Sequence, residues 1–313
     1  SRRQSSQICR VMANNLLVVG SIAYDNIRTP EASRDWILGG SAAYAALASS
    51  FYAPTRICGI VGKDFKPEDM QRLSRRGIDT STVECDPNGE TFFWCGSYHD
   101  NFSSRETLEV RVNVYENYEP KLNDTAKSSE FLLLGNIGPD DQTKVLDSMT
   151  KKPFVVHDTM DLWINIANAA VRAPVARADI FIVNDSEAKL LSGDRNIIRA
   201  GEALLRMGAK SVIVKTGEYG AMLFHKDGFF VIPAYPIHEL RDPTGAGDTF
   251  AGALTGHLAG SGKTDFRAIK SAMLAGAAAA SLTVESFSCD KLEEAGLEEI
   301  NRRREYIKNI AEI

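Results

Sequence analysis

Short apolar runs alternate with segments of helical periodicity along most of the chain. Six runs are rich in β-branched residues and apolar at successive positions: 15–20, 55–61, 130–135, 153–158, 179–184 and 210–215. Strands of a parallel sheet that helices cover on both sides have this pattern. Helical patterns lie between the runs, near 41–52, 67–76, 140–149, 186–192 and 197–207. The alternation predicts an α/β fold with a doubly wound, Rossmann-like, mainly parallel sheet flanked by helices.

Two segments, 91–100 and 108–117, have no helix between them and break this rhythm. The second alternates, with Leu108, Val110, Val112 and Val114 predicted on one face of a strand. Together with an extended piece at 27–38, these segments predict a small antiparallel β lid made of residues from about 27–38 and 88–118. The lid would close over a ligand or pair with its copy in a homodimer. Four of its aromatic and polar residues are expected to pack within the lid sheet or, alternatively, to contact the acceptor: Phe93, Trp94, Tyr98 and His99.

The last third of the chain is helical in pattern, over 247–259, 264–283 and 297–311, and no low-complexity linker divides the sequence. We therefore expect one domain over 14–313 that carries the lid. Residues 1–13 contain three arginines and no acid. We interpret them as a flexible extension rather than as an organelle targeting peptide.

Charge and cysteine content limit the classes of binding partner and the cellular compartment that the sequence suggests. The 313 residues carry a formal net charge of −5, with basic and acidic residues interspersed. This distribution argues against nucleic acid and anionic membrane surfaces as partners and favours a small molecule. The five cysteines form no C-x-x-C pair, which predicts reduced thiols in a cytoplasmic protein. No apolar run reaches the 18 residues of a membrane span.

The strongest chemical signal is the stretch 242–254, DPTGAGDTFAGAL. It predicts a glycine-containing turn that opens a helix of small residues, with Asp248 in the first turn. Unpaired N–H groups at a helix N-terminus bind anions, and glycine lets the backbone approach them. The simpler alternative is that Asp248 only complements the helix dipole.

This stretch resembles the signature of the ribokinase-like (PfkB) family of carbohydrate kinases. Four further motifs occur in the family's order: VVGSIAYD (18–25), LGGSAAYAA (38–46), VNDSE (183–187) and KTGEYGA (215–221). The resemblance spans roughly residues 15–285. It implies that Asp248 is the base that accepts the proton of the substrate hydroxyl. It also implies that Gly245, Ala246 and Gly247 form the anion hole for the γ-phosphoryl group of ATP.

The other motifs imply further roles. Asn184 and Glu187 would hold Mg²⁺, with Glu187 acting through water, and Asp242 would bind a monovalent cation such as K⁺. Without the resemblance, 183–191 would be a strand end followed by an N-capped helix. The nucleotide phosphates would lie near a turn made by Thr216, Gly217 and Gly220.

The acceptor side is implied by two motifs. Asp25, at the carboxyl end of the first strand, would bind substrate hydroxyls. Gly39 and Gly40 would form the lid hinge, with Ser41 and Tyr44 lining the acceptor site.

Three departures from the family pattern concern the acceptor and the base of the nucleotide. Tyr44 stands where many members have a sugar-binding asparagine. The stretch 157–163 lacks the usual asparagine and arginine, and the segment after 281 lacks an expected glycine. The chain is thus expected to be an ATP-dependent, Mg²⁺-requiring kinase acting on a hydroxyl of a sugar or polyol. The alternatives are a nucleoside kinase, a kinase of a hydroxymethyl heterocycle, and a ligand sensor without turnover.

Overall fold

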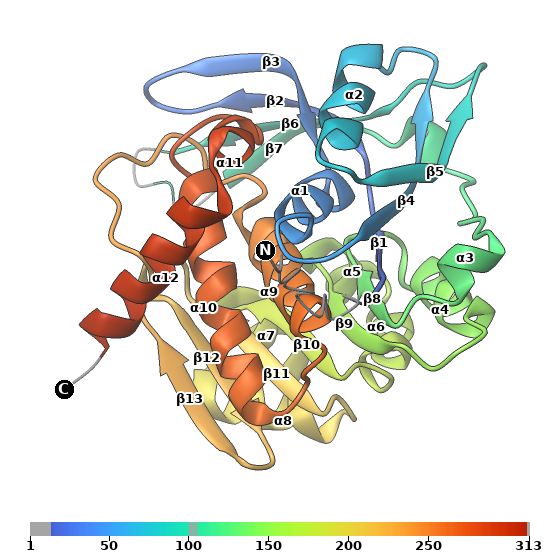
Figure 1. Ribbon diagram of the computed structural model, residues 1–313. Coiled ribbons are helices and arrows are strands. Elements are labelled where there is room, and N and C mark those ends of the chain that lie inside the picture. The colour runs from blue at the N-terminus through green and yellow to red at the C-terminus, as the bar shows by residue number, and fades with distance from the viewer. Residues whose placement is uncertain (1–13, 100–101, 103–104, 312–313) are drawn as a thin grey trace, which may run out of the picture.

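A nine-stranded sheet forms the centre of the molecule (Figure 1). The computed structural model describes residues 14–99, 102 and 105–311, so the extension predicted for 1–13 lies outside the described residues. The strand order is β13-β12-β11-β10-β9-β8-β1-β4-β5. Strands β1 to β11 of this sheet run parallel, and β12 and β13 form an antiparallel edge. The strands are β1 Leu16–Val19, β4 Thr55–Gly62, β5 Asp79–Asp86, β8 Phe131–Leu134, β9 Phe154–Asp158, β10 Ile180–Asn184, β11 Ser211–Lys215, β12 Ala221–His225 and β13 Gly228–Ile232.

Alternate residues of these strands enter different cores. Leu16 and Val18 of β1 pack into the cluster that contains α1, α9, α10 and α12, whereas Leu17 and Val19 pack on the opposite side. The predicted doubly wound α/β fold is confirmed. The helices are α1 Ser41–Ser49, α2 Pro67–Arg75, α3 Asp124–Lys127, α4 Pro139–Ser148, α5 Asp161–Ile166, α6 Asn168–Val175, α7 Asp185–Ser192, α8 Ile197–Arg206, α9 Ala246–Ser261, α10 Phe266–Thr283, α11 Asp290–Glu294 and α12 Leu297–Ile310.

A second sheet, which we call the lid sheet, has the order β3-β2-β6-β7 and lies at the top of Figure 1. Its strands are β2 Ala23–Arg28, β3 Ser33–Gly39, β6 Phe92–Tyr98 and β7 Arg105–Arg111. The pairs β2–β3 and β6–β7 are antiparallel, and β2 and β6 are parallel.

The strand predicted over 108–117 is wrong in its extent. β7 starts before it and stops at Arg111, and Asn113–Tyr115 forms a 3₁₀ turn. The alternation ends because the buried Tyr115 hydroxyl accepts hydrogen bonds from the N–H groups of Ile22 and Ile60, which draws this segment onto the main sheet.

No helix within the described ranges is long and apolar enough to cross a bilayer.

Candidate active site

The N-terminus of α9 is left open for a ligand. Gly245 is the N-cap, and its φ of 76° is the left-handed conformation that glycine tolerates. No side chain caps this helix end, so the N–H groups of its first turn can face an anion. The ring of Tyr44 lies so close to Gly245 that a Cβ atom there would collide with it. Gly245, Ala246 and Gly247 are therefore placed where an anion hole would be.

Asp248 lies in the first turn of α9. Burial raises the pKa of its carboxyl to about 7, and Asp158 raises it further, whereas Lys215 and Arg105 oppose the shift. A carboxyl beside a helix N-terminus would otherwise be a weak base. Burial thus gives Asp248 a pKa suited to accepting a proton near neutral pH.

The expected position of Asp25 was wrong. It does not end the first strand but lies inside β2, in the lid sheet. The carboxyl group packs against Gly39 of β3, where a Cβ atom would collide with it. Burial raises the pKa of Asp25 to about 8, and the nearby Asp242 and Asp248 raise it further. Because the charges of Asp242 and Asp248 act on it, Asp25 lies near the start of α9 although it belongs to the lid sheet.

Asp242 is fully buried just before the glycine turn. Its Oδ1 accepts a hydrogen bond of 2.9 Å from the Thr244 N–H, while Oδ2 has no hydrogen-bond partner among the described residues. Its own N–H donates to the carbonyl of Val284. Burial raises the pKa of Asp242 to about 6. An unpaired buried carboxylate oxygen is costly, so the atom is suited to a cation.

One face of the lid sheet meets this acidic cluster. Asp25 and Trp94 are register partners in β2 and β6, so their side chains share a face. Tyr98, four residues further along β6, is on that face too, and its hydroxyl lies 2.9 Å from the Thr244 hydroxyl. The predicted packing role holds for Phe93, which is buried on the other face with Tyr24. Tyr98 instead reaches Thr244 in the turn before α9, and Trp94 shares its face of the sheet.

Gly39 and Gly40, the residues predicted to form a hinge, lie where β3 passes into α1. Gly40 is the N-cap of α1 with a φ of 93°, and an added Cβ atom would collide with the carbonyl oxygen of Ser21. Ser41 is buried, and its Oγ accepts a hydrogen bond of 3.1 Å from the Ser21 N–H. Tyr44 is buried as well, and its hydroxyl has no hydrogen-bond partner within the described chain.

Asn184 and Glu187 form a capping box at the start of α7. The Asn184 Oδ1 accepts from the Glu187 N–H at 2.8 Å, and the Glu187 Oε2 accepts from the Asn184 N–H at 2.7 Å. The capped-helix interpretation is therefore correct as a description of local structure. Burial also raises the pKa of Glu187 to about 7. Its second carboxylate oxygen is not used by the capping box and can bind a further ligand.

Thr216, Gly217 and Gly220 make the turn between β11 and β12. The Thr216 hydroxyl donates to the Gly220 carbonyl at 3.0 Å. Gly217 and Gly220 have φ values of 59° and 103°, which explains the need for glycine. The turn follows directly on Lys215 at the carboxyl end of β11, the end at which ligands bind in open parallel sheets.

Three charged residues of the site were missed from the sequence: Asp158, Lys215 and Arg105. Lys215 Nζ lies 3.5 Å from Asp158 Oδ2, and both side chains are mostly buried. Arg105, in β7, lowers the pKa of both Asp25 and Asp248 by its charge. Asp158 is the last residue of β9, and Lys215 is the last residue of β11. The order of the strands in the sheet, which the sequence does not show, brings both residues close to α9.

Comparison with known proteins gives the family. Residues 13–295 match the model of the pfkB family of carbohydrate kinases. A cytidine kinase from Thermococcus kodakarensis is 31% identical over 252 residues, which are 79% of this chain and 88% of that protein. A 2-dehydro-3-deoxygluconokinase from Thermoproteus tenax is 24% identical over 69% of this chain and 71% of the relative.

Solved structures have the same fold. A nucleoside kinase from Methanocaldococcus jannaschii aligns with a TM-score of 0.75 at 20% identity, over 94% of this chain and 98% of that one. A nucleoside kinase from Burkholderia thailandensis, in complex with inosine, gives 0.75 at 23% identity, over 93% and 97%. Both likenesses agree with the two-sheet architecture described above. Since the family model matches nearly the whole chain, the protein belongs to the pfkB family of carbohydrate kinases and is an ATP-dependent kinase of a small molecule.

Proposed function

We propose that the site at the start of α9 transfers the γ-phosphoryl group of ATP to a hydroxyl of a nucleoside. Asp248 accepts the hydroxyl proton as the acceptor oxygen bonds to the γ-phosphorus and the bond from that phosphorus to the bridging oxygen of ADP breaks. The N–H groups of Gly245, Ala246 and Gly247 bind the transferring group. The observation that carries this proposal is the buried Asp248 carboxyl at an uncapped helix N-terminus, facing the buried Asp25 of the lid sheet.

The nucleotide would lie along the turn made by Thr216, Gly217 and Gly220, at the carboxyl end of the parallel strands. Mg²⁺ fits the acidic side chains nearby. Among the described residues no three His, Cys, Asp or Glu side chains form a metal cluster. Mg²⁺ usually keeps several waters and takes one or two carboxylates plus substrate phosphates. Glu187 therefore suits a role through water, beside Asn184, and the metal would supply charge for the phosphates. A protein from E. coli described as a ribokinase II has been solved with ATP and Mg²⁺.

Asp242 is the proposed ligand of a monovalent cation such as K⁺. Its buried Oδ2, without a partner in the described part of the chain, supports a positive ligand at this place. Since the Asp242 N–H is bound to the Val284 carbonyl, such a cation would steady the turn that leads to Gly245.

The acceptor proposed is a nucleoside for two reasons. The cytidine kinase relative covers most of both chains. In addition, Trp94 shares a lid face with Asp25, and its indole lies against Gly96, where a Cβ atom would collide with it. Arg105 lies over this ring, 5.4 Å from its centroid. A flat aromatic side chain beside a hydroxyl-binding acid can stack on a nucleobase while the acid binds the ribose.

A screen of nucleosides, free sugars and polyols for ADP release tests this assignment. Trp94→Leu is expected to raise KM for the nucleoside about tenfold, because base stacking contributes roughly 1–3 kcal/mol, and to change KM for a free sugar little. Trp36→Leu is the control, since Trp36 packs against Phe93 on the opposite face. A sugar or polyol that turns over faster than every nucleoside would contradict the nucleoside assignment and favour the sugar kinase alternative. Binding without turnover of any acceptor would favour a sensor.

The lid sheet is also the proposed contact of a homodimer. β7 is an edge strand of this sheet, and Leu108, Val110 and Val112 expose apolar side chains there. Open edges with apolar side chains tend to pair with another chain. A second copy of this chain would cover them.

A further inference from the structure

Lys215 is a basic residue that reaches the start of α9 from the main sheet. It is the last residue of β11, and its side chain is 18% exposed. A Cβ atom added to Gly247 would lie 2.7 Å from the Lys215 Nζ. The ammonium group is therefore in contact with the glycine that helps to form the proposed anion hole.

Three carboxyl groups lie near the Lys215 ammonium, more than a single ion pair would require. Burial disfavours its ammonium form, yet the carboxyl groups of Asp158, Glu187 and Asp248 outweigh burial and raise its pKa. The hydrogen bond from Nζ to Asp158 is long, at 3.5 Å, and Asp158 is its one hydrogen-bond partner among the described residues. An ammonium group has three N–H donors, so it retains capacity for another ligand. That capacity is directed at the anion hole.

The position of Lys215 on the chain would put it between the proposed sites of the two substrates. Thr216 and Gly217, the next residues, begin the turn proposed for the ATP phosphates, while Nζ contacts Gly247. The lysine side chain thus runs from the donor side of the site to the helix that carries the base. A phosphoryl group moving between the two would pass this ammonium.

We propose that Lys215 is a catalytic residue that binds the transferring phosphoryl group, and that Asp158 is a positioning residue that holds its ammonium. This inference rests on the proposed function. Charge on the phosphoryl oxygens is stabilised by preorganised cations, and removing one such donor typically lowers kcat by a factor of about 100 to 1,000. The competing explanation is that Lys215 only neutralises the buried Asp158, because an unpaired buried charge destabilises the fold.

The test compares Lys215→Met, Lys215→Arg and the double variant Lys215→Met with Asp158→Asn. If Lys215 binds the phosphoryl group, Met lowers kcat on the order of 100-fold or more, Arg retains part of the activity, and the double variant stays as slow as Lys215→Met. If Lys215 only balances Asp158, the double variant recovers both thermal stability and kcat, which overturns the proposal. Lys226→Met is the control, because this lysine is 78% exposed in its pair with Asp227.

Nucleotide binding gives a second readout that needs no acceptor. Lys215→Met should weaken binding of a non-hydrolysable ATP analogue with Mg²⁺ about tenfold and leave ADP binding almost unchanged, since only the analogue has a γ-phosphoryl group. Equal loss for both nucleotides would contradict the proposal. If the wild type phosphorylates no nucleoside, the nucleoside assignment fails, while this binding comparison still decides the role of Lys215.

Discussion

At the residue scale, the protonation of Asp248 should set the lower pH limit of catalysis. Its folded pKa of about 7 is above the ordinary value of 3.8, chiefly because the group is buried. Only the carboxylate can accept the acceptor proton, and below about pH 7 the protonated form predominates. We expect kcat/KM, which reports the free enzyme, to fall about tenfold per pH unit below 7 and to level off above it.

A pH–rate profile with the identified acceptor checks this expectation. Asp248→Asn should lower kcat by at least about 100-fold while nucleotide binding persists. A wild-type profile that is flat down to pH 5 would show that Asp248 does not titrate as the base.

The stability of the fold depends on pH in the opposite direction. Because the folded state binds this proton more tightly than the unfolded chain, the contribution of Asp248 to stability is lost as the pH rises from about 4 to 7.

Some residues of the candidate site could be predicted from the sequence, and others could not. The placement of Asp248 and its glycines at a helix N-terminus could be predicted because the whole signal lies within a few consecutive residues. The same holds for the capping partners Asn184 and Glu187. Lys215 opens the motif at 215–221 and Asp158 lies in the stretch 157–163, but neither side chain was marked as a site residue, since a polar residue at a strand end is ordinary. These two residues can be recognised as neighbours only from the strand order, which brings together positions that are 57 residues apart in the chain.

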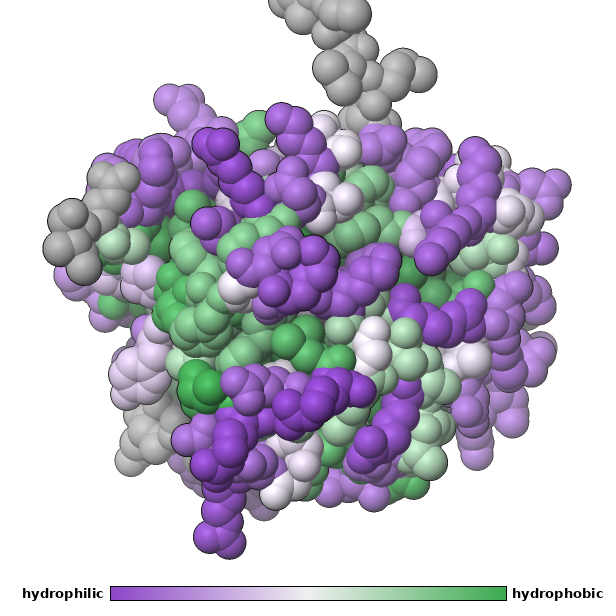
Figure 2. Space-filling model, turned by 90° about the horizontal axis from the view of Figure 1, so that it is seen from below, coloured by the Kyte–Doolittle hydropathy of each residue, from purple (hydrophilic) through white to green (hydrophobic). Residues whose placement is uncertain are grey.

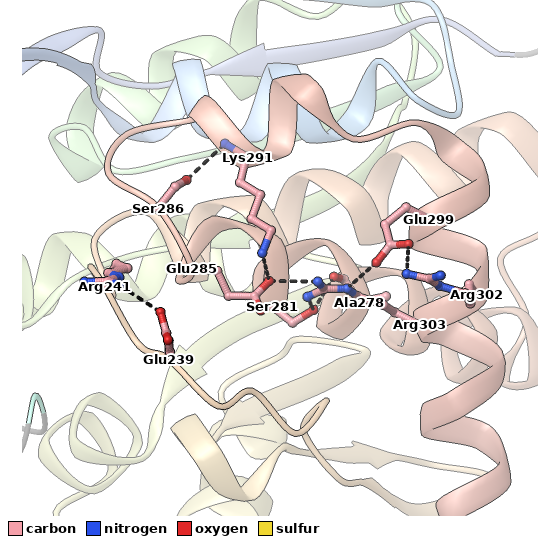
Figure 3. A network of polar contacts seen from close by, with 10 residues as sticks. All are labelled: Glu239, Arg241, Ala278, Ser281, Glu285, Ser286, Lys291, Glu299, Arg302 and Arg303. Carbon is pink, nitrogen blue, oxygen red and sulfur yellow. Dashed lines mark hydrogen bonds and ion pairs between the residues drawn. The ribbon is translucent and has the colours of Figure 1, made fainter.

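At the element scale, a network around Arg303 fastens α12 to the end of α10 and the segment after it (Figure 3). The buried Arg303 guanidinium donates to Glu299 Oε1 at 2.9 Å, to Ser281 Oγ at 2.9 Å and to Glu285 Oε2 at 2.7 Å. Glu285 directly follows Val284, whose carbonyl accepts the N–H of Asp242. The C-terminal helix thereby supports the segment that holds Asp242.

Arg303→Met should therefore destabilise the fold by about 3 kcal/mol, because three hydrogen bonds of a buried guanidinium are lost. Lys291 still pairs with Glu285, and Arg302 still pairs with Glu299. Urea unfolding measures the loss. Arg302→Met is the matched control, because this arginine also contacts Glu299 but is 76% exposed, and exposed pairs contribute little. Equal effects of the two arginine variants would contradict a special role for the buried guanidinium.

Periodicity predicted the elements of the main domain better than those of the lid. Strands such as β8 and β10 are buried on both faces, so their apolar runs are unmistakable. β5 was missed because its residues, DTSTVECD, are mostly polar at the sheet edge. Asp25 was assigned to the wrong strand because only the residues from Gly20 to Ile22 separate β1 from β2. The hydrophobic pattern does not reveal that the chain passes from the large sheet to the lid sheet between β1 and β2.

At the scale of the whole molecule, two open sheet edges expose apolar side chains. The dimer proposal assigns the interface to one of these edges and not to the other. Val110 on β7 of the lid sheet is 47% exposed, and Val231 on β13 of the large sheet is 44% exposed. The β12–β13 hairpin lies in the lower part of Figure 1, and Figure 2 views the molecule from below. That face shows hydrophobic residues surrounded by hydrophilic ones. Exposure alone therefore does not choose the interface.

The lid edge is the expected interface because closing it also shields the acceptor side, where Trp94 and Val110 are register partners on one face. Val110→Lys should convert a dimer into a monomer in sedimentation experiments and raise KM for the acceptor, because a charge on the strand opposes pairing. Val231→Lys, matched in residue type and exposure, should leave the dimer intact. A monomeric wild type would contradict the dimer, and dissociation by Val231→Lys alone would place the interface on the large sheet.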